Sequence, residues 1–151
     1  MSAAGFTSSF TVDQNPGETF KAITDLRGWW SEEIEGNTDK LGGEFTYRYQ
    51  DVHKCQLKLT ELIPDRKAVW HVLDNYFNFT EDKTEWIGTD LIFEVAEKGD
   101  ETEIHFTHVG LVPDYECFDI CSNEWSRYVN GSLRSLITTG KGQPNEKESG
   151  R

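Results

Sequence analysis

Positive charge is scarce in this sequence, in which 15 lysine and arginine residues stand against 27 aspartate and glutamate residues, for a formal net charge of −12 at pH 7. A chain with this excess of negative charge is repelled by a nucleic-acid backbone and by an anionic lipid surface. We therefore expect no nucleic-acid partner and no membrane partner. Because the acidic residues are spread along the whole chain, they indicate a solvated surface and a cytoplasmic protein.

Long apolar runs and paired cysteines are missing as well. No uninterrupted apolar stretch approaches the roughly 20 residues that a membrane-spanning helix needs. The first ten residues contain neither the basic region nor the apolar region of a secretory signal. The three cysteines are an odd number without the spacing of a disulfide framework, which favours a reducing compartment. These absences again predict a cytoplasmic protein.

The composition otherwise suits one folded domain. The 151 residues are 36% hydrophobic and 13% aromatic, enough for a sizeable core. No internal repeat or linker divides the chain. We predict a single domain over residues 1–145 and a disordered tail over residues 146–151, where polar and charged residues dominate.

The clearest periodic pattern lies between Cys117 and Gly140 and predicts one long helix. Its apolar residues recur at gaps of three and four, and Gly140, followed by a proline, supplies the end of the helix. Ser132 interrupts the apolar stripe, so the surface that it faces is either very close or hollow. The residues of the stripe are Phe118, Cys121, Trp125, Val129, Ser132, Leu133 and Leu136.

The rest of the chain predicts a strand, short helices and then a series of antiparallel strands. Asn15-Pro16 begins a capped helix, the adjacent pair Trp29-Trp30 suggests that one indole lies outside the main core, and residues 31–43 form a short second helix or a loop. From residue 43 the apolar period is two, with tight turns at Gln50-Asp51, Pro64-Asp65 and Gly99-Asp100. Residues 74–85 are the expected mobile flap.

This order predicts an α+β fold in which a curved antiparallel sheet of about six or seven strands wraps around the long C-terminal helix. One or two short helices follow the first strand. The terminal helix is the element long enough to cover the concave face of such a sheet.

Short motifs spread from Phe6 to Pro144 carry a family resemblance. They are Asn15-Pro16 with Phe20, Trp29-Trp30, Gly42-Gly43 with Phe45, Trp86-Ile87-Gly88-Thr89, Phe106-Thr107-His108 with Gly110-Leu111, and Trp125 with Ser132-Leu133. The chain resembles the START-like superfamily, also called SRPBCC, with its helix-grip fold. Within it, the chain is similar to the C-terminal domain of the activator of heat-shock-protein-90 ATPase.

The resemblance implies a cavity between sheet and helix that often holds an apolar small molecule, and it links the chain to chaperones and the stress response. It does not supply a reaction, because the fold hosts carriers, receptors, cyclases and chaperone activators alike.

Candidate chemical groups do not form a recognisable catalytic or metal site. His105 and His108 have an odd offset on a predicted strand, so their side chains point to opposite faces. Cys117 and Cys121 could share one helix side, but no second ligand pair supports zinc. Glu61 is a single carboxylate without an acid–base partner. We therefore expect no catalytic residues, no metal and no cofactor, and an enzyme is the less favoured reading.

Aromatic side chains are the strongest functional signal. Large rings pack with gaps, and a small polar residue on the central helix leaves another. These features predict a ligand pocket with Trp125 and Ser132 on its helix wall and with His108 and Tyr47 as polar points. The predicted ligand-binding residues are Trp29, Phe45, Tyr47, Trp70, Phe77, Trp86, Phe93, Phe106, His108, Trp125, Tyr128 and Ser132.

Three functions remain in view. The favoured one is non-catalytic binding of a small hydrophobic or aromatic molecule in this cavity. The first alternative is an interaction module like the chaperone ATPase activators, and the second is a cyclase- or dehydratase-type enzyme that uses His108, Tyr47 or Glu61. A homodimer is compatible with the sequence.

Overall fold

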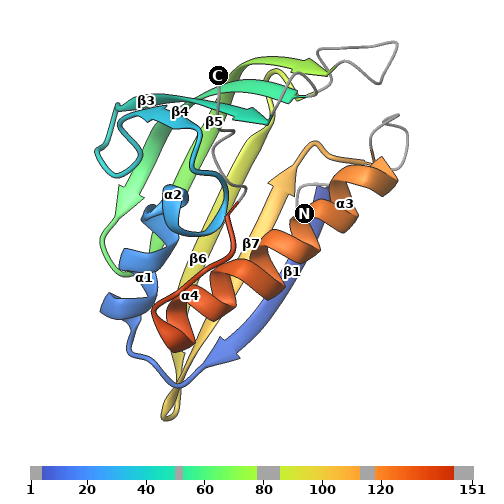
Figure 1. Ribbon diagram of the computed structural model, residues 1–151. Helices are drawn as coiled ribbons and strands as arrows, with labels where there is room; N and C mark the ends of the chain where they lie inside the picture. Colours follow the sequence, from blue (N-terminus) through green and yellow to red (C-terminus); the bar gives the residue numbers. More distant parts are fainter. Residues whose placement is uncertain (1–4, 50–52, 78–85, 113–117, 145–151) are drawn as a thin grey trace.

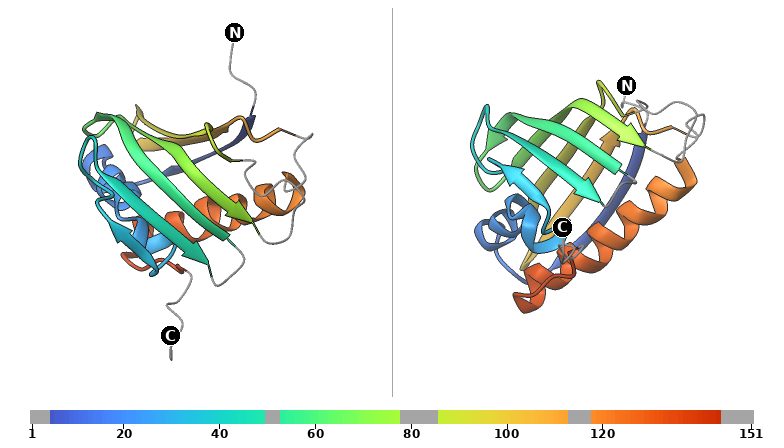
Figure 2. Two further views of the ribbon diagram at one scale, coloured as in Figure 1. Left: turned by 90° about the horizontal axis from the view of Figure 1, so that it is seen from above. Right: turned by 45° about the horizontal axis from the view of Figure 1, so that its top comes forward.

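A computed structural model describes residues 5–49, 53–77, 86–112 and 118–144 of the chain. A curved sheet wraps around one long helix, and two short helices lie beside the sheet at one end (Figures 1 and 2). The predicted α+β helix-grip architecture is confirmed. In chain order the elements are β1 (Gly5–Val12), α1 (Pro16–Thr24), α2 (Leu26–Trp29), β2 (Ile34–Gly36), β3 (Glu44–Tyr49), β4 (His53–Ile63), β5 (Lys67–Phe77), β6 (Asp90–Lys98), β7 (Glu101–Val109), α3 (Phe118–Ser126), η1 (Arg127–Leu133) and α4 (Arg134–Thr139).

The sheet has seven strands in the order β1-β7-β6-β5-β4-β3-β2, and each neighbouring pair is antiparallel. Alternation explains the strands: in β7, Ile104, Phe106 and His108 are buried, whereas His105 is exposed. Two predicted turns are confirmed, with Asp65 and Gly99 at φ values of 65° and 64°. The predicted turn at Gln50-Asp51 lies outside the described residues.

Strand β5 contains an irregularity that determines which side chains face the helix. Its pairing with β4 runs Leu57 with Val72 and then Gln56 with Asp74, so Leu73 is an extra residue. A bulge of this kind reverses the alternation of the side chains that follow it. As a result Asn75 and Phe77 are buried on the concave side. Residues 74–77 of the predicted flap therefore belong to a strand, and 78–85 lie outside the described residues.

The short helices follow their sequence signals. Asn15 caps α1, because its Oδ1 accepts from the backbone N–H of Glu18 at 2.8 Å and its amide donates to the Glu18 carboxylate at 3.1 Å. The expectation that Trp29 or Trp30 leaves the core is wrong: both are buried, with 0% and 2% of their surface exposed. The predicted helix or loop after them instead contains the short strand β2.

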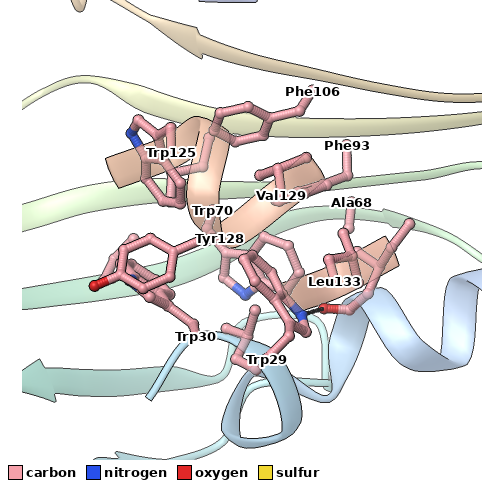
Figure 3. Packing of buried hydrophobic residues seen from close by; sticks show 14 of the residues in the cluster. Trp29, Trp30, Ala68, Trp70, Phe93, Phe106, Trp125, Tyr128, Val129 and Leu133 are labelled. Carbon is pink, nitrogen blue, oxygen red and sulfur yellow. Dashed lines mark hydrogen bonds between the residues drawn. The ribbon is translucent and has the colours of Figure 1, made fainter. Parts of the chain in front are cut away.

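The C-terminal helix runs without a break through α3, η1 and α4 and ends at Gly140, whose φ is 83°. Its middle segment η1 is π-helical, with Tyr128, Val129, Ser132 and Leu133 buried. Cys117, the predicted first residue, lies outside the described residues. Large rings and aliphatic side chains from helix and sheet meet beneath this helix (Figure 3). Within the described residues, no helix has the length and apolar character needed to cross a bilayer.

Candidate functional site

A small recess lies between α3 and the adjoining ends of strands β3, β4 and β5. Its volume is about 120 Å³. It reaches the surface beside Ile120, which is 52% exposed. The side chains around it are mostly aromatic, namely Trp30, Tyr47, Tyr49, His53, Phe77, Trp86, Ile120, Cys121, Glu124, Trp125 and Tyr128.

The sheet wall of the recess is built by strand register. Tyr49 pairs with His53 across β3 and β4, and His53 pairs with Phe77 across β4 and β5. Directly opposed residues on adjacent strands point to the same face, so these three rings form one row. Phe77 joins the row because the bulge at Leu73 turns it inward. The centroids of the His53 and Phe77 rings are 4.4 Å apart.

The helix wall follows from helical spacing. Cys121, Trp125 and Tyr128 lie four and three residues apart, so they share one face of the helix. Ile120 and Glu124 flank that face on the solvent side. The side chain of Glu124 is 46% exposed. The recess is therefore apolar inside and carries a carboxylate at its mouth.

Two further indoles come from loops. Trp86 stacks on Trp125 with centroids 5.7 Å apart and an interplanar angle of 13°, and its ring meets His53 edge-on at 4.7 Å. Trp30, which follows α2, stacks on Tyr47 at 4.3 Å and 18°. Offset stacked and edge-to-face arrangements are the favourable ones for aromatic rings. The walls thus support one another through ring contacts.

His53 is the titratable ring inside the recess. Its Nε2 is 2.7 Å from Oδ1 of Asn75. Burial lowers the pKa of His53 to about 4, although the hydrogen bond to Asn75 acts in the opposite direction. His53 is therefore neutral at pH 7. Since a carbonyl oxygen can only accept, Nε2 carries the proton and Nδ1 is the acceptor of this ring.

Tyr47 is also neutral at pH 7. Burial, followed by the charge and the hydrogen bond of Tyr128, raises the pKa of Tyr47 well above its usual value, and the charge of Glu124 adds to the effect. Of the described residues that line the recess, Glu124 alone carries a carboxylate, and none is a lysine or an arginine.

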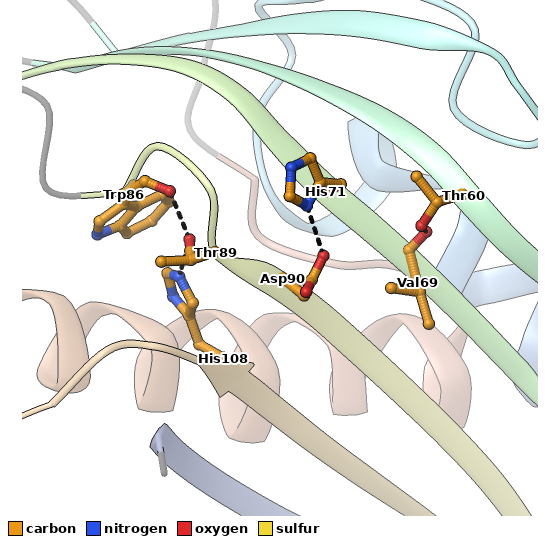
Figure 4. Close-up of polar contacts among 7 residues, drawn as sticks. All are labelled: Thr60, Val69, His71, Trp86, Thr89, Asp90 and His108. Atoms are coloured by element: carbon orange, nitrogen blue, oxygen red, sulfur yellow. Dashed lines mark hydrogen bonds and ion pairs between the residues drawn. The ribbon is translucent and has the colours of Figure 1, made fainter. Parts of the chain in front are cut away.

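His108 lies next to the recess but takes no part in its wall. The indole N–H of Trp125 donates to Nδ1 of His108 at 3.0 Å. Nε2 then donates to Oγ1 of Thr89 at 2.9 Å, and Thr89 donates to the carbonyl of Trp86 at 2.6 Å (Figure 4). Burial lowers the pKa of His108 to about 3, with a smaller contribution from His53. Both ring nitrogens are used, so His108 is a structural residue.

This chain of hydrogen bonds explains two of the sequence motifs. Gly88 has a φ of 85° in the turn that carries Trp86 to Thr89. Gly110 has a φ of 100°, and a Cβ atom there would lie 2.7 Å from Cγ2 of Thr89. Only glycine combines that backbone conformation with that close approach. The motifs therefore fix Trp86 and Trp125 at the edge of the recess.

The structure brings some of the predicted ligand-binding residues together and separates others. Five of the predicted ligand-binding residues line the recess, namely Tyr47, Phe77, Trp86, Trp125 and Tyr128. Six others do not line it and pack in the interior, namely Trp29, Phe45, Trp70, Phe93, Phe106 and His108. For example, Phe93 contacts Trp29, Trp70 and Phe106 with ring centroids 4.7–5.7 Å apart. These side chains fill the described interior beneath the helix.

Ser132 needs the clearest correction. Its hydroxyl donates to the carbonyl oxygen of Trp29 at 2.7 Å and accepts from the backbone N–H of Gln143 at 2.7 Å. A Cβ atom on Gly142 would lie 2.2 Å from the carbonyl oxygen of Gly28. The helix thus lies very close to the α2 backbone and to the returning C-terminal segment. Of the two alternatives for Ser132, close approach is correct, and the residue is not in the recess.

Six lining residues were missed: Trp30, Tyr49, His53, Ile120, Cys121 and Glu124. Trp30 was visible as the second member of the tryptophan pair, and Cys121 belonged to the apolar stripe. Tyr49 and His53 flank residues 50–52, where alternation gives no register. Ile120 and Glu124 lie beside the apolar stripe, where a helical wheel alone predicts solvent.

The other chemical candidates are separated in space. His105 and His108 lie on opposite faces of β7, as expected from their offset. Glu61 forms a partly exposed ion pair with Lys67 at 3.4 Å. His71 contacts Asp90 at 2.8 Å, also away from the recess (Figure 4). Within the described residues, no three histidine, cysteine or acidic side chains converge on a point that could hold a metal ion.

Comparison with known proteins finds solved structures with a similar fold. No family model and no curated protein matches the sequence. The Aha1 dimer from Colwellia psychrerythraea is similar in structure, with a TM-score of 0.73, 23% identity, and coverage of 92% of this chain and 99% of that chain. CalU16 from Micromonospora echinospora has a TM-score of 0.63 and 16% identity, with coverage of 91% and 76%. DynU16, a putative protein in the dynemicin biosynthetic locus, has a TM-score of 0.67 and 12% identity, with coverage of 94% and 50%.

Proposed function

We propose that this START-like, helix-grip protein binds a small hydrophobic or aromatic molecule in the recess between α3 and strands β3–β5. The observation that carries the proposal is the lining itself, in which eight of eleven side chains are aromatic or imidazole rings. Apolar concave sites with a few polar groups are the usual form of small-molecule sites. The recess also keeps a path to the surface beside Ile120.

The volume limits the ligand class. An apolar cavity of roughly 150 Å³ accepts benzene, and the recess, at about 120 Å³, is slightly smaller. A compact ring or head group therefore fits with small side-chain adjustments. A sterol or a long acyl chain would have to leave most of its surface outside, so lipid carriage is not the expected use.

The test is binding of a graded panel: benzene, phenol, indole and a long-chain fatty acid, measured by calorimetry and by tryptophan fluorescence. We expect the compact rings to bind and the fatty acid not to bind. The control is Cys121→Phe, which places a larger side chain in the recess. Equal binding to both forms, or no binding of any compact ring to the wild type, would refute the proposal.

Structural likeness to Aha1, an activator of the Hsp90 ATPase, favours one second candidate, a chaperone-interaction module. Likeness at 23% identity indicates a shared fold but does not identify a partner. This candidate is tested by measuring association with purified Hsp90 and the change in the Hsp90 ATPase rate. Absence of both effects removes it.

The structural likeness to a dimer also makes self-association of this chain a proposal. Light scattering across a concentration series tests it.

An enzymatic use of the recess has less support. A general acid or base needs a free nitrogen or oxygen within hydrogen-bond reach of the substrate. Both nitrogens of His108 are occupied, and Glu61 pairs with Lys67 on the outer part of β4. Tyr47 is in the recess, but its raised pKa opposes use as a base at pH 7.

A further inference from the structure

We propose that the preferred ligand of the recess is a small organic cation, such as a quaternary ammonium group, held against the aromatic ring faces and paired with Glu124. The proposal rests on the proposed function of the recess and adds the charge of the ligand. It is argued from the chemistry of the walls, from the sign of the charge at the mouth and from the behaviour of a neighbouring arginine.

The walls are built from the ring types that bind cations. The π-face of an indole or phenol ring is negative, and a cation within about 6 Å of the ring centre is attracted to it, most strongly by tryptophan. Three tryptophans and three tyrosines line this recess. Trp30 and Tyr47 stack face to face, as do Trp86 and Trp125, so each pair forms one rigid aromatic wall. Ring faces fixed by such packing need little reordering when a ligand binds.

The charge at the mouth has the matching sign. Glu124 is the charged group of the described lining, and no described lysine or arginine contributes to it. His53 is neutral because burial holds its pKa at about 4. A neutral apolar ligand gains nothing from the carboxylate, whereas a cation gains an ion pair beside a low-dielectric interior. The net charge of −12 further favours the approach of cations.

Arg127 shows that this corner already attracts a cation. The guanidinium carbon of Arg127 lies 4.6 Å from the centre of the Tyr128 ring. Its Nε donates to Oε2 of Glu124 at 3.2 Å. The chain thus uses one ring and one carboxylate of the recess to hold its own cationic group. Because the Arg127 side chain is 55% exposed and one turn from Glu124, it can move aside at small cost.

The size also agrees. A trimethylammonium group is as compact as a small ring, and the recess has about 120 Å³. Its methyl groups need no hydrogen bonds, so the apolar walls are no disadvantage. A primary ammonium, by contrast, would leave N–H donors unpaired against the rings. The walls therefore favour a methylated ammonium over lysine-like amines.

The first experiment compares choline with its carbon isostere, in which the quaternary nitrogen is a carbon atom, by calorimetry on the full chain. The two molecules have nearly the same shape and differ in charge. We expect choline to bind at least roughly fivefold more tightly, as cation–π attraction of this kind predicts. We also expect its affinity to fall as salt rises. Equal affinities would overturn the proposal.

The second experiment uses charge variants. Glu124→Gln should weaken choline binding roughly three- to fivefold, as for a partly exposed charge pair. Arg127→Gln should strengthen it, since a competing cation is removed. Neither change should alter binding of the carbon isostere. The matched control is Glu97→Gln, which removes one negative charge from an exposed position near the C-terminal end of β6. Glu97 does not line the recess. If Glu97→Gln weakens choline binding as much as Glu124→Gln, the assignment of Glu124 is wrong.

The failures of the two proposals can be told apart. If the carbon isostere and phenol bind wild-type protein as tightly as choline and are excluded by Cys121→Phe, the recess is a ligand site but not a cation site. If no compact molecule binds, both proposals fail. If choline binds more tightly than the carbon isostere and phenol, and Cys121→Phe excludes all three, both proposals stand.

Discussion

The indole N–H of Trp125 donates to Nδ1 of His108 across 3.0 Å, and this one contact fixes the protonation state of the histidine. An indole nitrogen can only donate, so Nδ1 must be unprotonated and the imidazole must be neutral. Nε2 then carries the proton and donates a hydrogen bond to Oγ1 of Thr89. The result is a buried histidine that orients two tryptophans of the recess without facing a ligand.

Trp125→Phe should destabilise the protein more than Trp86→Phe. The two indoles stack on each other and are both buried, so the loss of ring volume is comparable. Removing the Trp125 N–H leaves Nδ1 of His108 unpaired, which costs about 1–3 kcal/mol. Within the described chain the N–H of Trp86 has no partner, so its removal carries no such cost. Urea unfolding at pH 7 measures both variants, and equal losses would contradict the hydrogen-bond assignment.

Stability should fall as the pH drops below 6.5. His53 and His108 have pKa values of about 4 and about 3 in the folded protein, below the ordinary value of 6.5. The unfolded chain therefore takes up protons that the folded chain does not. Each histidine makes its full contribution to the free energy of unfolding above pH 6.5. As the pH falls from 6.5 to the folded pKa, that contribution decreases by up to about 1.4 kcal/mol per pH unit.

The measurement is the free energy of unfolding between pH 7.5 and pH 5, a range above most carboxylate titrations. His53→Gln should reduce the slope of unfolding free energy against pH, because the contribution of His53 is removed and that of His108 remains. The control is His105→Gln, at an exposed position on β7, and its slope is compared with that of the His53 variant. An unaltered slope in the His53 variant would show that this ring is protonated in the folded state as readily as in the unfolded one.

Ser132→Leu should be strongly destabilising, because the hydroxyl contacts the backbone of Trp29 and no space exists for a longer side chain. Ser132→Ala should cost about 1–3 kcal/mol, since the N–H of Gln143 loses its acceptor. Ser126→Ala, earlier in the same helix, is the matched control and should change stability by less than about 0.5 kcal/mol. Thermal unfolding measures all three. A leucine tolerated at position 132 would indicate a hollow there.

Gly110→Ala and Gly131→Ala should have opposite effects. Alanine at position 110 must adopt a φ of 100° and meets Cγ2 of Thr89 at 2.7 Å, so the change should cost more than about 1 kcal/mol. Gly131 lies on the exposed side of η1, where an added Cβ meets no atom within 4 Å. Alanine there should stabilise the helix by about 0.5–1 kcal/mol. Chemical denaturation of the two variants checks the pair, and destabilisation by both would mean that η1 needs its glycine.

The sequence predicted the architecture well because its main signals are local. The apolar stripe from Phe118 to Leu136 predicts a helix, and the alternation of apolar residues predicts the strands. The helix cap at Asn15 is likewise a pattern of residues close together in the sequence. The site was harder to predict because it depends on register. A bulge at Leu73 decides that Phe77 faces inward, and nothing in the sequence marks that extra residue.

Ser132 shows the other limit. A small polar residue in an apolar stripe is equally consistent with a void and with a close backbone contact, and only the path of the chain after α4 decides between them. The long-range pairs that close the interior, such as Ser132 with Trp29, are separated by 103 positions in the sequence. The recess therefore lies nearer the start of the helix than Ser132, and five of the predicted aromatic residues line it.

A crystal structure of the protein soaked with a compact aromatic guest such as phenol tests the central claim most directly. The claim is that open space lies at the α3 end of the helix and that the interior around Ser132 is filled. We predict density for one guest bounded by Trp86, Trp125 and Tyr47. Density for a guest beside Ser132, or an empty recess at saturating phenol, would contradict it.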